Sequence, residues 1–360
     1  MSAAFGRLTL GEGGTPVIRT GRLAVGEGVL IKDETRNPTG SFKDRMSSLA
    51  LAHAVGLGAN RVVCASTGNA AASAAAYAAT AGLPCVVVVP AATDPAKIAQ
   101  AVAHGALTVS VAGNYADAYR VAARLEEAEG FVNLTTTYRN PVAVSALRAV
   151  GYEIIAQLEP VPERIYVPVG AGPLLRGLDL AFKEALEVGV VASRPRLVAV
   201  QAVGCSPIVS AFAEGSDGVS AAEDPKTVAR GIADPLQGYA EEANLTLASI
   251  RSSRGHAIAV SDAEITFAAD LLAATTGLSA ELAGAAGLAG LLKDRRHGLG
   301  PGDGTADMVM LTGAGWKDLA GRTAPGQTVK FDPTAEPFDK IVELADSLGA
   351  RRAPDPIEVV

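Results

Sequence analysis

Short runs of valine, isoleucine and other apolar residues alternate with alanine-rich segments of helical length through most of this chain. Parallel strands joined by crossover helices have this pattern, because helices cover both faces of a parallel sheet and its strands are apolar throughout. The pattern therefore predicts an α/β fold. The expected strands are Arg61–Ala65, Cys85–Pro90, Leu107–Val111, Arg164–Val169, Arg196–Ala202 and Met308–Thr312, and the expected helices are Ala70–Ala81, Asp94–His104, Tyr115–Ala128, Val142–Leu158, Leu174–Leu186, Asp262–Thr275 and Glu281–Lys293.

Length and charge narrow the class of protein further. A chain of 360 residues predicts two domains, and 49% hydrophobic with 19% charged residues predicts a buried core rather than disorder. The 31 basic and 38 acidic residues give a net charge of −7, and no cluster of lysine and arginine stands out. Nucleic acid is therefore not an expected partner, because phosphate-backbone binders carry a basic face.

Neither a leader nor a membrane span is expected from the sequence. The uncharged stretch Val62 to Thr93 is interrupted by the turn residues Ser66–Asn69 and Gly82–Pro84, and the first six residues lack a basic start. Three cysteines without Cys-x-x-Cys spacing predict buried, reduced thiols, no metal site and a cytoplasmic location. The tail from Arg322 to Val360 is expected to lie on the surface, with one helix from Pro337 to Leu348.

The most informative segment runs from Lys32 to Arg45 and reads Lys-Asp-Glu-Thr-Arg-Asn-Pro-Thr-Gly-Ser-Phe-Lys-Asp-Arg. Its Asn-Pro-Thr-Gly predicts a turn, and Ser41 is expected to cap a helix whose first turn contains Lys43. The helix dipole disfavours a cation there, so the pKa of Lys43 is expected to fall toward the neutral amine that forms Schiff bases. A lysine in a turn is otherwise usually a solvated surface residue.

Three further turns follow expected strands: Ser66–Asn69, Gly170–Gly177 and Thr312–Gly315. Backbone N–H groups at a helix N-terminus suit a carboxylate or phosphate, although an ordinary capping turn has the same composition. The second turn lacks the third glycine of a dinucleotide-binding loop. Because open α/β sheets bind ligands at the carboxyl ends of their strands, the turns together predict a ligand site.

With these motifs in this order, the sequence resembles the threonine synthase branch of the fold type II (β-family) pyridoxal-phosphate-dependent enzymes. The resemblance implies a tryptophan synthase β-like fold, in which two open parallel-sheet α/β domains hold the cofactor between them. It implies a large domain of residues 1–45 and 145–360, with a small substrate-side domain of residues 46–144 inserted in it. The matching segments are Leu10–Pro16, Lys32–Arg45, Ala65–Gly82, Lys97–Ala106, Val167–Gly172 and Leu311–Asp318.

The resemblance also implies roles for single residues. Lys43 would form the Schiff base with pyridoxal 5′-phosphate and then shuttle protons at the substrate carbons. The residues implied to bind the cofactor are Lys43, Asn69 (to the ring oxygen), Gly170, Ala171, Gly172, Pro173 and Leu174 (around the phosphate), and Thr312 (facing the pyridine nitrogen). Those implied to bind the substrate are Ser66, Thr67, Gly68 and Asn69 (at the α-carboxylate side), Asn133, and Arg139.

The implied reaction is that of threonine synthase. A neutral hydroxyl at Thr312 cannot stabilise a protonated ring, which favours elimination and replacement at Cβ or Cγ. O-phosphohomoserine would lose phosphate from Cγ and gain water at Cβ, giving L-threonine. The alternative is β-replacement or β-elimination on another amino acid, either O-phosphoserine, as in a cysteate synthase, or serine or threonine, as in a dehydratase. A non-catalytic binding protein is disfavoured by the retained Lys43.

Three positions depart from the family pattern. Leu134 replaces a serine that would donate a hydrogen bond in the substrate-phosphate pocket, and Pro173 has no N–H for the cofactor phosphate. Gly284 replaces a serine in the segment Glu281–Ala286, near the expected ring position. The expected partner is a small amino-acid substrate, and the branch implies a homodimer without a separate regulatory domain.

Overall fold

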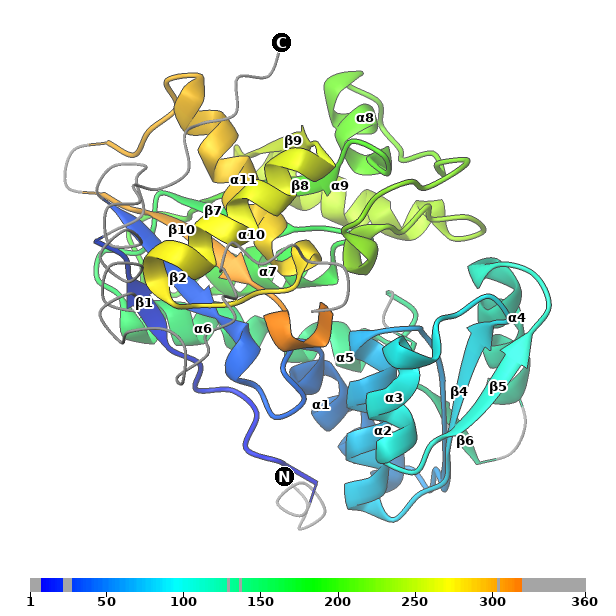
Figure 1. Cartoon of the computed structure of the whole chain (residues 1–360). Coiled ribbons are helices and arrows are strands. Elements are labelled where there is room, and N and C mark those ends of the chain that lie inside the picture. The colour runs from blue at the N-terminus through cyan, green and yellow to red at the C-terminus, as the bar shows by residue number, and fades with distance from the viewer. Residues whose placement is uncertain (1–7, 22–27, 128–129, 136–137, 303–304, 319–360) are drawn as a thin grey trace, which may run out of the picture.

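The computed structural model describes residues 8–21, 28–127, 130–135, 138–302 and 305–318. Its strands form two separate sheets (Figure 1). The larger sheet has the strand order β1 (Val17–Arg19), β2 (Val29–Asp33), β10 (Asp307–Leu311), β7 (Arg164–Pro168), β8 (Arg196–Ala202) and β9 (His256–Val260). The smaller sheet has the order β5 (Leu107–Val111), β4 (Cys85–Pro90), β3 (Arg61–Ala65) and β6 (Phe131–Asn133).

All pairs of neighbouring strands are parallel except β1 and β2, which are antiparallel. The two sheets define two parallel α/β domains, here called the large domain and the small domain. The helices are α1 (Lys43–Gly56), α2 (Asn69–Ala81), α3 (Pro95–Ala103), α4 (Tyr115–Glu126), α5 (Pro141–Ala146), α6 (Arg148–Gln157), α7 (Pro173–Glu187), α8 (Pro207–Ala213), α9 (Asn244–Ser252), α10 (Asp262–Thr276) and α11 (Leu282–Arg296), with short 3-10 turns that include η5 (Gly315–Asp318).

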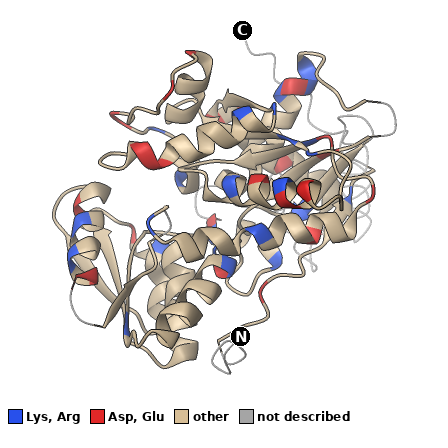
Figure 2. Ribbon diagram, turned by 180° about the vertical axis from the view of Figure 1, so that it is seen from behind, with Lys and Arg blue, Asp and Glu red and all other residues tan. Residues whose placement is uncertain are grey.

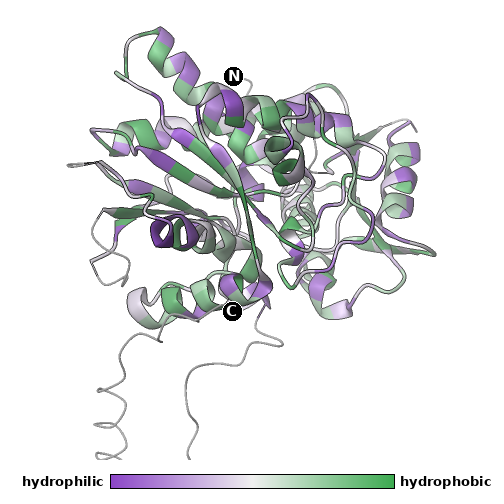
Figure 3. Cartoon of the chain, turned by 90° about the horizontal axis from the view of Figure 1, so that it is seen from above, coloured by the Kyte–Doolittle hydropathy of each residue, from purple (hydrophilic) through white to green (hydrophobic). Residues whose placement is uncertain are grey.

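Helices cover both faces of the large sheet, and the strand residues alternate between them. Ile165 and Val167 of β7 pack in one apolar cluster with helix α7, whereas Tyr166 packs in a second cluster with α10 and α11. Because successive strand residues point to opposite faces, a strand covered on both sides must be apolar at every position. Figure 3 shows strands with green, hydrophobic stretches running between the helices, and Figure 2 shows basic and acidic residues interspersed over both domains.

Helices α6 and α7 approach each other closely through two glycines. A Cβ at Gly177 would lie 2.6 Å from the Leu147 Cβ, and a Cβ at Gly151 would lie 2.5 Å from the Ala181 Cβ. Leu147 separates α5 from α6, and its N–H donates to Val144 three residues back instead of four. The single helix predicted over Val142–Leu158 is therefore wrong, because the chain tightens where the α7 backbone packs against Leu147.

A buried ion network joins strand β2 to helices α1 and α6. Glu153 of α6 lies 2.8 Å from the ammonium of Lys32 and 2.6 Å from the guanidinium of Arg45, which also pairs with Glu34 at 2.7 Å. The Lys32 ammonium donates a further hydrogen bond of 2.7 Å to the Thr15 carbonyl. Burial alone would raise the pKa of Glu153, but the hydrogen bonds from Arg45 and Lys32 lower it to about 2.

The structure confirms the predicted α/β class. All six predicted strands are present within a residue or two, and the remaining predicted helices are present within two or three residues, the largest difference being α11, which continues to Arg296. Strands β1, β2, β6 and β9 and helices α8 and α9 were not among the predicted elements. The predicted surface tail and the helix at Pro337–Leu348 lie outside the described residues.

Disulfides, membrane-spanning helices and metal clusters are all absent from the described part of the chain. Cys64, Cys85 and Cys205 are buried and form no disulfide with one another. No described helix is both long and apolar enough to cross a bilayer. The described histidines, cysteines and acids form no group of three or more that could hold a metal ion.

Candidate active site

The predicted strand-end turns meet between the two domains. Backbone hydrogen bonds join two of them directly: the Phe42 N–H donates to the Thr312 carbonyl at 3.2 Å, and the Ser41 backbone pairs with Gly313. The Glu281 N–H donates to the Gly313 carbonyl at 3.0 Å, which brings the start of α11 to the same place. The carboxyl ends of β2, β3, β7 and β10 thus supply the turns around one site, as expected for an α/β sheet.

Lys43 is the first residue of α1, as predicted, but Ser41 does not cap this helix. The N-cap residue is Phe42, and the Ser41 hydroxyl is buried without a hydrogen-bond partner. The turn is held instead by Asp44, whose carboxylate accepts hydrogen bonds of 2.6 Å from both the N–H and the hydroxyl of Thr39. The prediction of a serine cap is therefore wrong, because the helix begins one residue later than a Ser41 cap requires.

The amine of Lys43 lies deep in the molecule, although its side chain keeps some contact with solvent. Burial lowers its pKa from 10.5 to about 8, while the negative charges of Asp234 and Glu281 oppose this change. The Phe42 ring centre lies 4.5 Å from the amine. The lowered pKa agrees with the prediction, but desolvation is its main cause rather than the helix dipole. A lysine of this kind holds a useful fraction of neutral amine near neutral pH.

Asn69 begins α2 and is fixed by two residues of the large domain. Its Nδ2 donates to Glu281 Oε1 at 2.6 Å, and its Oδ1 accepts a hydrogen bond of 2.9 Å from the Lys317 ammonium. Burial raises the pKa of Glu281, although Lys317 and Asn69 both favour the charged carboxylate. The segment before Asn69 is open: Ser66 and Thr67 are partly exposed, and Gly68 has no atom within 4 Å of its missing Cβ.

The turn at Gly170–Leu174 has the features of an anion site. Gly172 has a φ of +96° and precedes α7, and a Cβ there would overlap the Thr246 side chain, so glycine is required. Among the described residues, no oxygen accepts a hydrogen bond from the N–H groups of Ala171, Gly172, Leu174 or Leu175, which are buried. Buried donors without acceptors at a helix N-terminus fit the phosphate group of a cofactor.

Thr312 is nearly buried and follows β10. Helix α11 packs directly on this turn through Gly284, because a Cβ there would lie 3.0 Å from the Gly313 carbonyl oxygen and 3.4 Å from the Thr312 nitrogen. Gly284, one of the departures from the family pattern, thus has a steric reason. A serine at this position would push α11 away from the turn.

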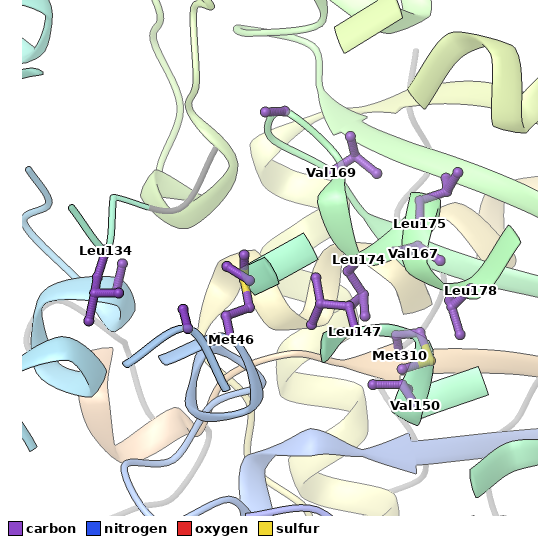
Figure 4. Packing of buried hydrophobic residues seen from close by; sticks show 14 of the residues in the cluster. Met46, Leu134, Leu147, Val150, Val167, Val169, Leu174, Leu175, Leu178 and Met310 are labelled. Atoms are coloured by element: carbon purple, nitrogen blue, oxygen red, sulfur yellow. The ribbon is translucent and has the colours of Figure 1, made fainter. Parts of the chain in front are cut away.

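Asn133 and Arg139 are both bound to Glu126. The Arg139 Nε donates to Glu126 Oε2 at 2.6 Å, and Asn133 Nδ2 donates to the same oxygen at 3.2 Å. The Arg139 guanidinium also lies 5.9 Å from the Tyr119 ring centre. The side chain of Leu134 is buried in the apolar core, and Figure 4 shows it at one edge of the packed cluster.

Two residues of the site escaped sequence reasoning. Asp234 lies deep, with its Cβ 3.2 Å from the position of a Cβ on Gly170, and it interacts electrostatically with Lys43. Its Oδ1 accepts hydrogen bonds from the Tyr239 hydroxyl at 2.7 Å and the Leu236 N–H at 3.0 Å, and burial raises its pKa. Lys317 is the second such residue. Asp234 lies in no recognisable motif, whereas Lys317 lies within the matching segment Leu311–Asp318, although no role was predicted for it.

The sequence and the structure were compared with known proteins. Residues 8–312 match the family described as "Pyridoxal-phosphate dependent enzyme". The chain is 40% identical over 291 residues to a threonine synthase of Methanosarcina acetivorans, covering 79% of this chain and 71% of that one. It is 37% identical over 316 residues to a threonine synthase of Methanocaldococcus jannaschii, covering 86% of this chain and 76% of that one.

A solved structure of maize serine racemase superposes with a TM-score of 0.73 and covers 96% of both chains, at 22% sequence identity. At this identity the likeness shows the fold, which is that of the fold type II enzymes. The family match spans residues 8–312, which is most of the chain, and the two relatives are aligned with 79% and 86% of it. The chain therefore belongs to the pyridoxal-phosphate dependent enzymes, in the branch that contains the threonine synthases.

Proposed function

We propose that this pyridoxal-phosphate-dependent lyase converts O-phosphohomoserine and water into L-threonine and phosphate. The observation that carries the proposal is the buried Lys43 amine, whose pKa is lowered to about 8 and which interacts electrostatically with Cys64 of the small domain and with Asp234 and Glu281 of the large domain. The identity to named threonine synthases supports the choice of substrate. Bound pyridoxal phosphate supplies an electron-withdrawing ring that stabilises negative charge on the carbons of an attached amino acid.

Lys43 is proposed as the residue that attaches the cofactor and, when released, accepts and returns protons at the substrate carbons. With a pKa of about 8, roughly a tenth of such amines are neutral at pH 7, so the free energy needed to deprotonate Lys43 into a proton acceptor is small. Asn69 is proposed to donate to the ring oxygen. Thr312 is proposed to face the ring nitrogen through its neutral hydroxyl.

We propose the remaining contacts to cofactor and substrate from the hydrogen-bond donors that line the site. The N–H groups of residues 170–172, Leu174 and Leu175 would hold the cofactor phosphate, and Pro173 supplies none. Ser66, Thr67 and Gly68 would bind the substrate α-carboxylate, because their strand-end turn is open. Arg139, with Asn133, would bind the substrate phosphate.

A second candidate function is β-elimination or β-replacement on another amino acid, such as O-phosphoserine, serine or threonine. The specific observation in its favour is the negative charge around the substrate side. Arg139 is already paired with Glu126, and Asp234 places a further carboxyl close to Lys43. Both features weaken binding of a dianionic phosphate leaving group, because like charges repel and a paired arginine is partly neutralised, so within this candidate they favour serine or threonine over O-phosphoserine.

The two candidates are separated by titrating the holoenzyme with O-phosphohomoserine, O-phosphoserine, serine and threonine. The absorbance of the bound cofactor, phosphate release and the amino-acid product are followed together, with Lys43→Ala as the inactive control. Phosphate release with threonine formation from O-phosphohomoserine alone would support the first proposal. Turnover of one of the other three would support the second, and no response to any of them would contradict both.

We also propose that the chain works in the cytoplasm as a homodimer, with a small domain of residues 46–144. The three thiols without disulfides support a reducing compartment, and the family supports the dimer. Light scattering coupled to size exclusion tests the dimer directly. A monomeric mass for the active holoenzyme would contradict it.

A further inference from the structure

Lys317 contacts the amide of Asn69 across the domain boundary. Asn69 begins α2, which covers the small sheet, whereas Glu281 precedes α11 and Lys317 lies in η5, both of the large domain. In Figure 1 the orange turn that contains Lys317 lies between the two sheets. The hydrogen bonds of 2.6 Å to Glu281 and 2.9 Å from Lys317 therefore both join the large domain to Asn69.

These two partners select one orientation of the Asn69 amide. An ammonium only donates hydrogen bonds and an ionised carboxylate only accepts them, whereas an amide has one side of each kind. Rotating the amide by half a turn would place its NH₂ beside the Lys317 ammonium and its oxygen beside Glu281, losing both hydrogen bonds at once. In the observed orientation Nδ2 keeps a second N–H, for which the described residues supply no acceptor.

The Lys317 side chain is itself held in place. Gly40, in the turn before Lys43, has a φ of +83°, and a Cβ there would lie 2.7 Å from Trp316 Cζ2 and 3.1 Å from Lys317 Cε. The absence of a side chain at Gly40 thus lets the stem of Lys317 lie against this turn, and the Ala314 N–H donates to the Gly40 carbonyl at 2.8 Å. Burial lowers the pKa of the Lys317 ammonium, and the negative charges of Glu281 and Asp44 oppose this change.

We propose that Lys317 is a positioning residue for the cofactor: it fixes the amide of Asn69 so that the free N–H of Nδ2 is presented to the cofactor ring oxygen. The inference rests on the proposed role of Asn69 but not on the identity of the substrate. Lys317 acts through Asn69 and through the domain contact that the two residues make.

The test compares the holoenzyme with Lys317→Met, Lys317→Arg, Asn69→Ala and the double variant Lys317→Met/Asn69→Ala. Lys293→Met is the matched control, because its ammonium also donates to a protein oxygen, the Ala259 carbonyl at 2.8 Å, on the far part of α11. The readouts are the absorbance spectrum of the bound cofactor, its release rate on dilution, and kcat and KM. The first two need no substrate, so they stay informative if the proposed reaction is wrong.

Lys317→Met is expected to shift the spectrum and to raise the cofactor release rate about tenfold, the equivalent of one lost charge-assisted hydrogen bond. Asn69→Ala should shift the spectrum and raise the release rate in the same way, and the double variant should release the cofactor no faster than Asn69→Ala. Lys317→Arg, which keeps the positive charge, should release the cofactor much more slowly than Lys317→Met. Lys293→Met should leave spectrum and release unchanged. A wild-type spectrum and release rate in Lys317→Met would overturn the inference, as would effects of Lys317→Met and Asn69→Ala that add in full.

Discussion

Replacing Lys43 by methionine should stabilise the folded chain when the cofactor has been removed. The side chains have similar length, but methionine carries no charge to desolvate. In the folded chain burial holds the pKa of the Lys43 amine at about 8, against 10.5 for an ordinary lysine. A group whose charged form is disfavoured by folding lowers the stability of the folded state wherever that charge is present.

The size of this effect and its pH dependence follow from the two pKa values. A difference of about 2.5 units at 1.36 kcal/mol each gives about 3 kcal/mol, which is an upper limit because the side chain keeps some contact with water. Below pH 8 the amine is charged in both states, so the full cost is present. Between pH 8 and 10.5 folding releases the proton, and the cost falls to about 1 kcal/mol near pH 10.

The assay is urea unfolding of cofactor-free wild type and Lys43→Met, followed by circular dichroism at pH 7 and pH 10. Taking the difference between the two proteins at each pH cancels every other titrating group. Lys43→Met should be more stable by about 2–3 kcal/mol at pH 7, with a gap that shrinks toward pH 10. Lys293→Met serves as a control and should be less stable than wild type, because it loses a hydrogen bond to Ala259. A gap that does not change with pH, or a destabilised Lys43→Met at pH 7, would refute the reasoning.

Three further outcomes are expected. Gly172→Ala should destabilise the chain by about 2–5 kcal/mol and weaken cofactor binding in a dialysis assay, because the methyl overlaps Thr246 at a positive φ. Gly189→Ala, where φ is +74° and no atom lies near, should cost only about 1 kcal/mol, and equal losses would show that Thr246 is not the cause. Glu153→Gln should cost about 3 kcal/mol at pH 7 by leaving Lys32 and Arg45 without this counter-ion. Since the folded pKa of Glu153 is about 2, the difference from wild type in urea unfolding should persist above pH 4.5 and fade as the pH drops toward 2, and a constant difference would contradict the network's role. Arg139→Met should raise KM for a phosphorylated substrate about tenfold or more with little change in kcat. The control Arg120→Met, on the exposed side of α4, should change neither KM nor kcat. The same KM in both variants would exclude Arg139 from the substrate site.

The sequence predicted best the parts of the fold whose signal is local. Strands such as Arg61–Ala65 and Arg196–Ala202 are buried on both faces, so they read as apolar runs, and the small or polar residues that follow them mark the turns of the site. Strand β2 was missed because it contains Lys32 and Asp33, which are fully buried yet charged. Their burial depends on partners such as Glu153 and Arg36, which only the folded chain supplies.

The residues of the candidate site also differ in how well the sequence predicts them. Lys43, Asn69 and the Gly170–Leu174 turn were predicted from local motifs, since each lies at or just before the start of a helix. Asp234 comes from a loop and Lys317 from the short 3-10 turn η5, and their importance follows from depth and contacts rather than from spacing. Leu134 is buried in the apolar core, so it offers no hydrogen-bond donor in place of the serine of the family pattern.

The position of β10 in the large sheet has a consequence for the order of folding. This strand lies between β2 and β7 although it comes from residues 307–311, so the middle of the sheet is completed only after all the other described strands have been synthesised. The small sheet uses only residues 61–133, without interruption, and can form while synthesis continues. Because Thr312 and Lys317 directly follow β10, chains that end before this strand lack both the centre of the sheet and one wall of the site. Chains that end before β10 should therefore be unable to fold into a protein that competes with the full chain for the cofactor.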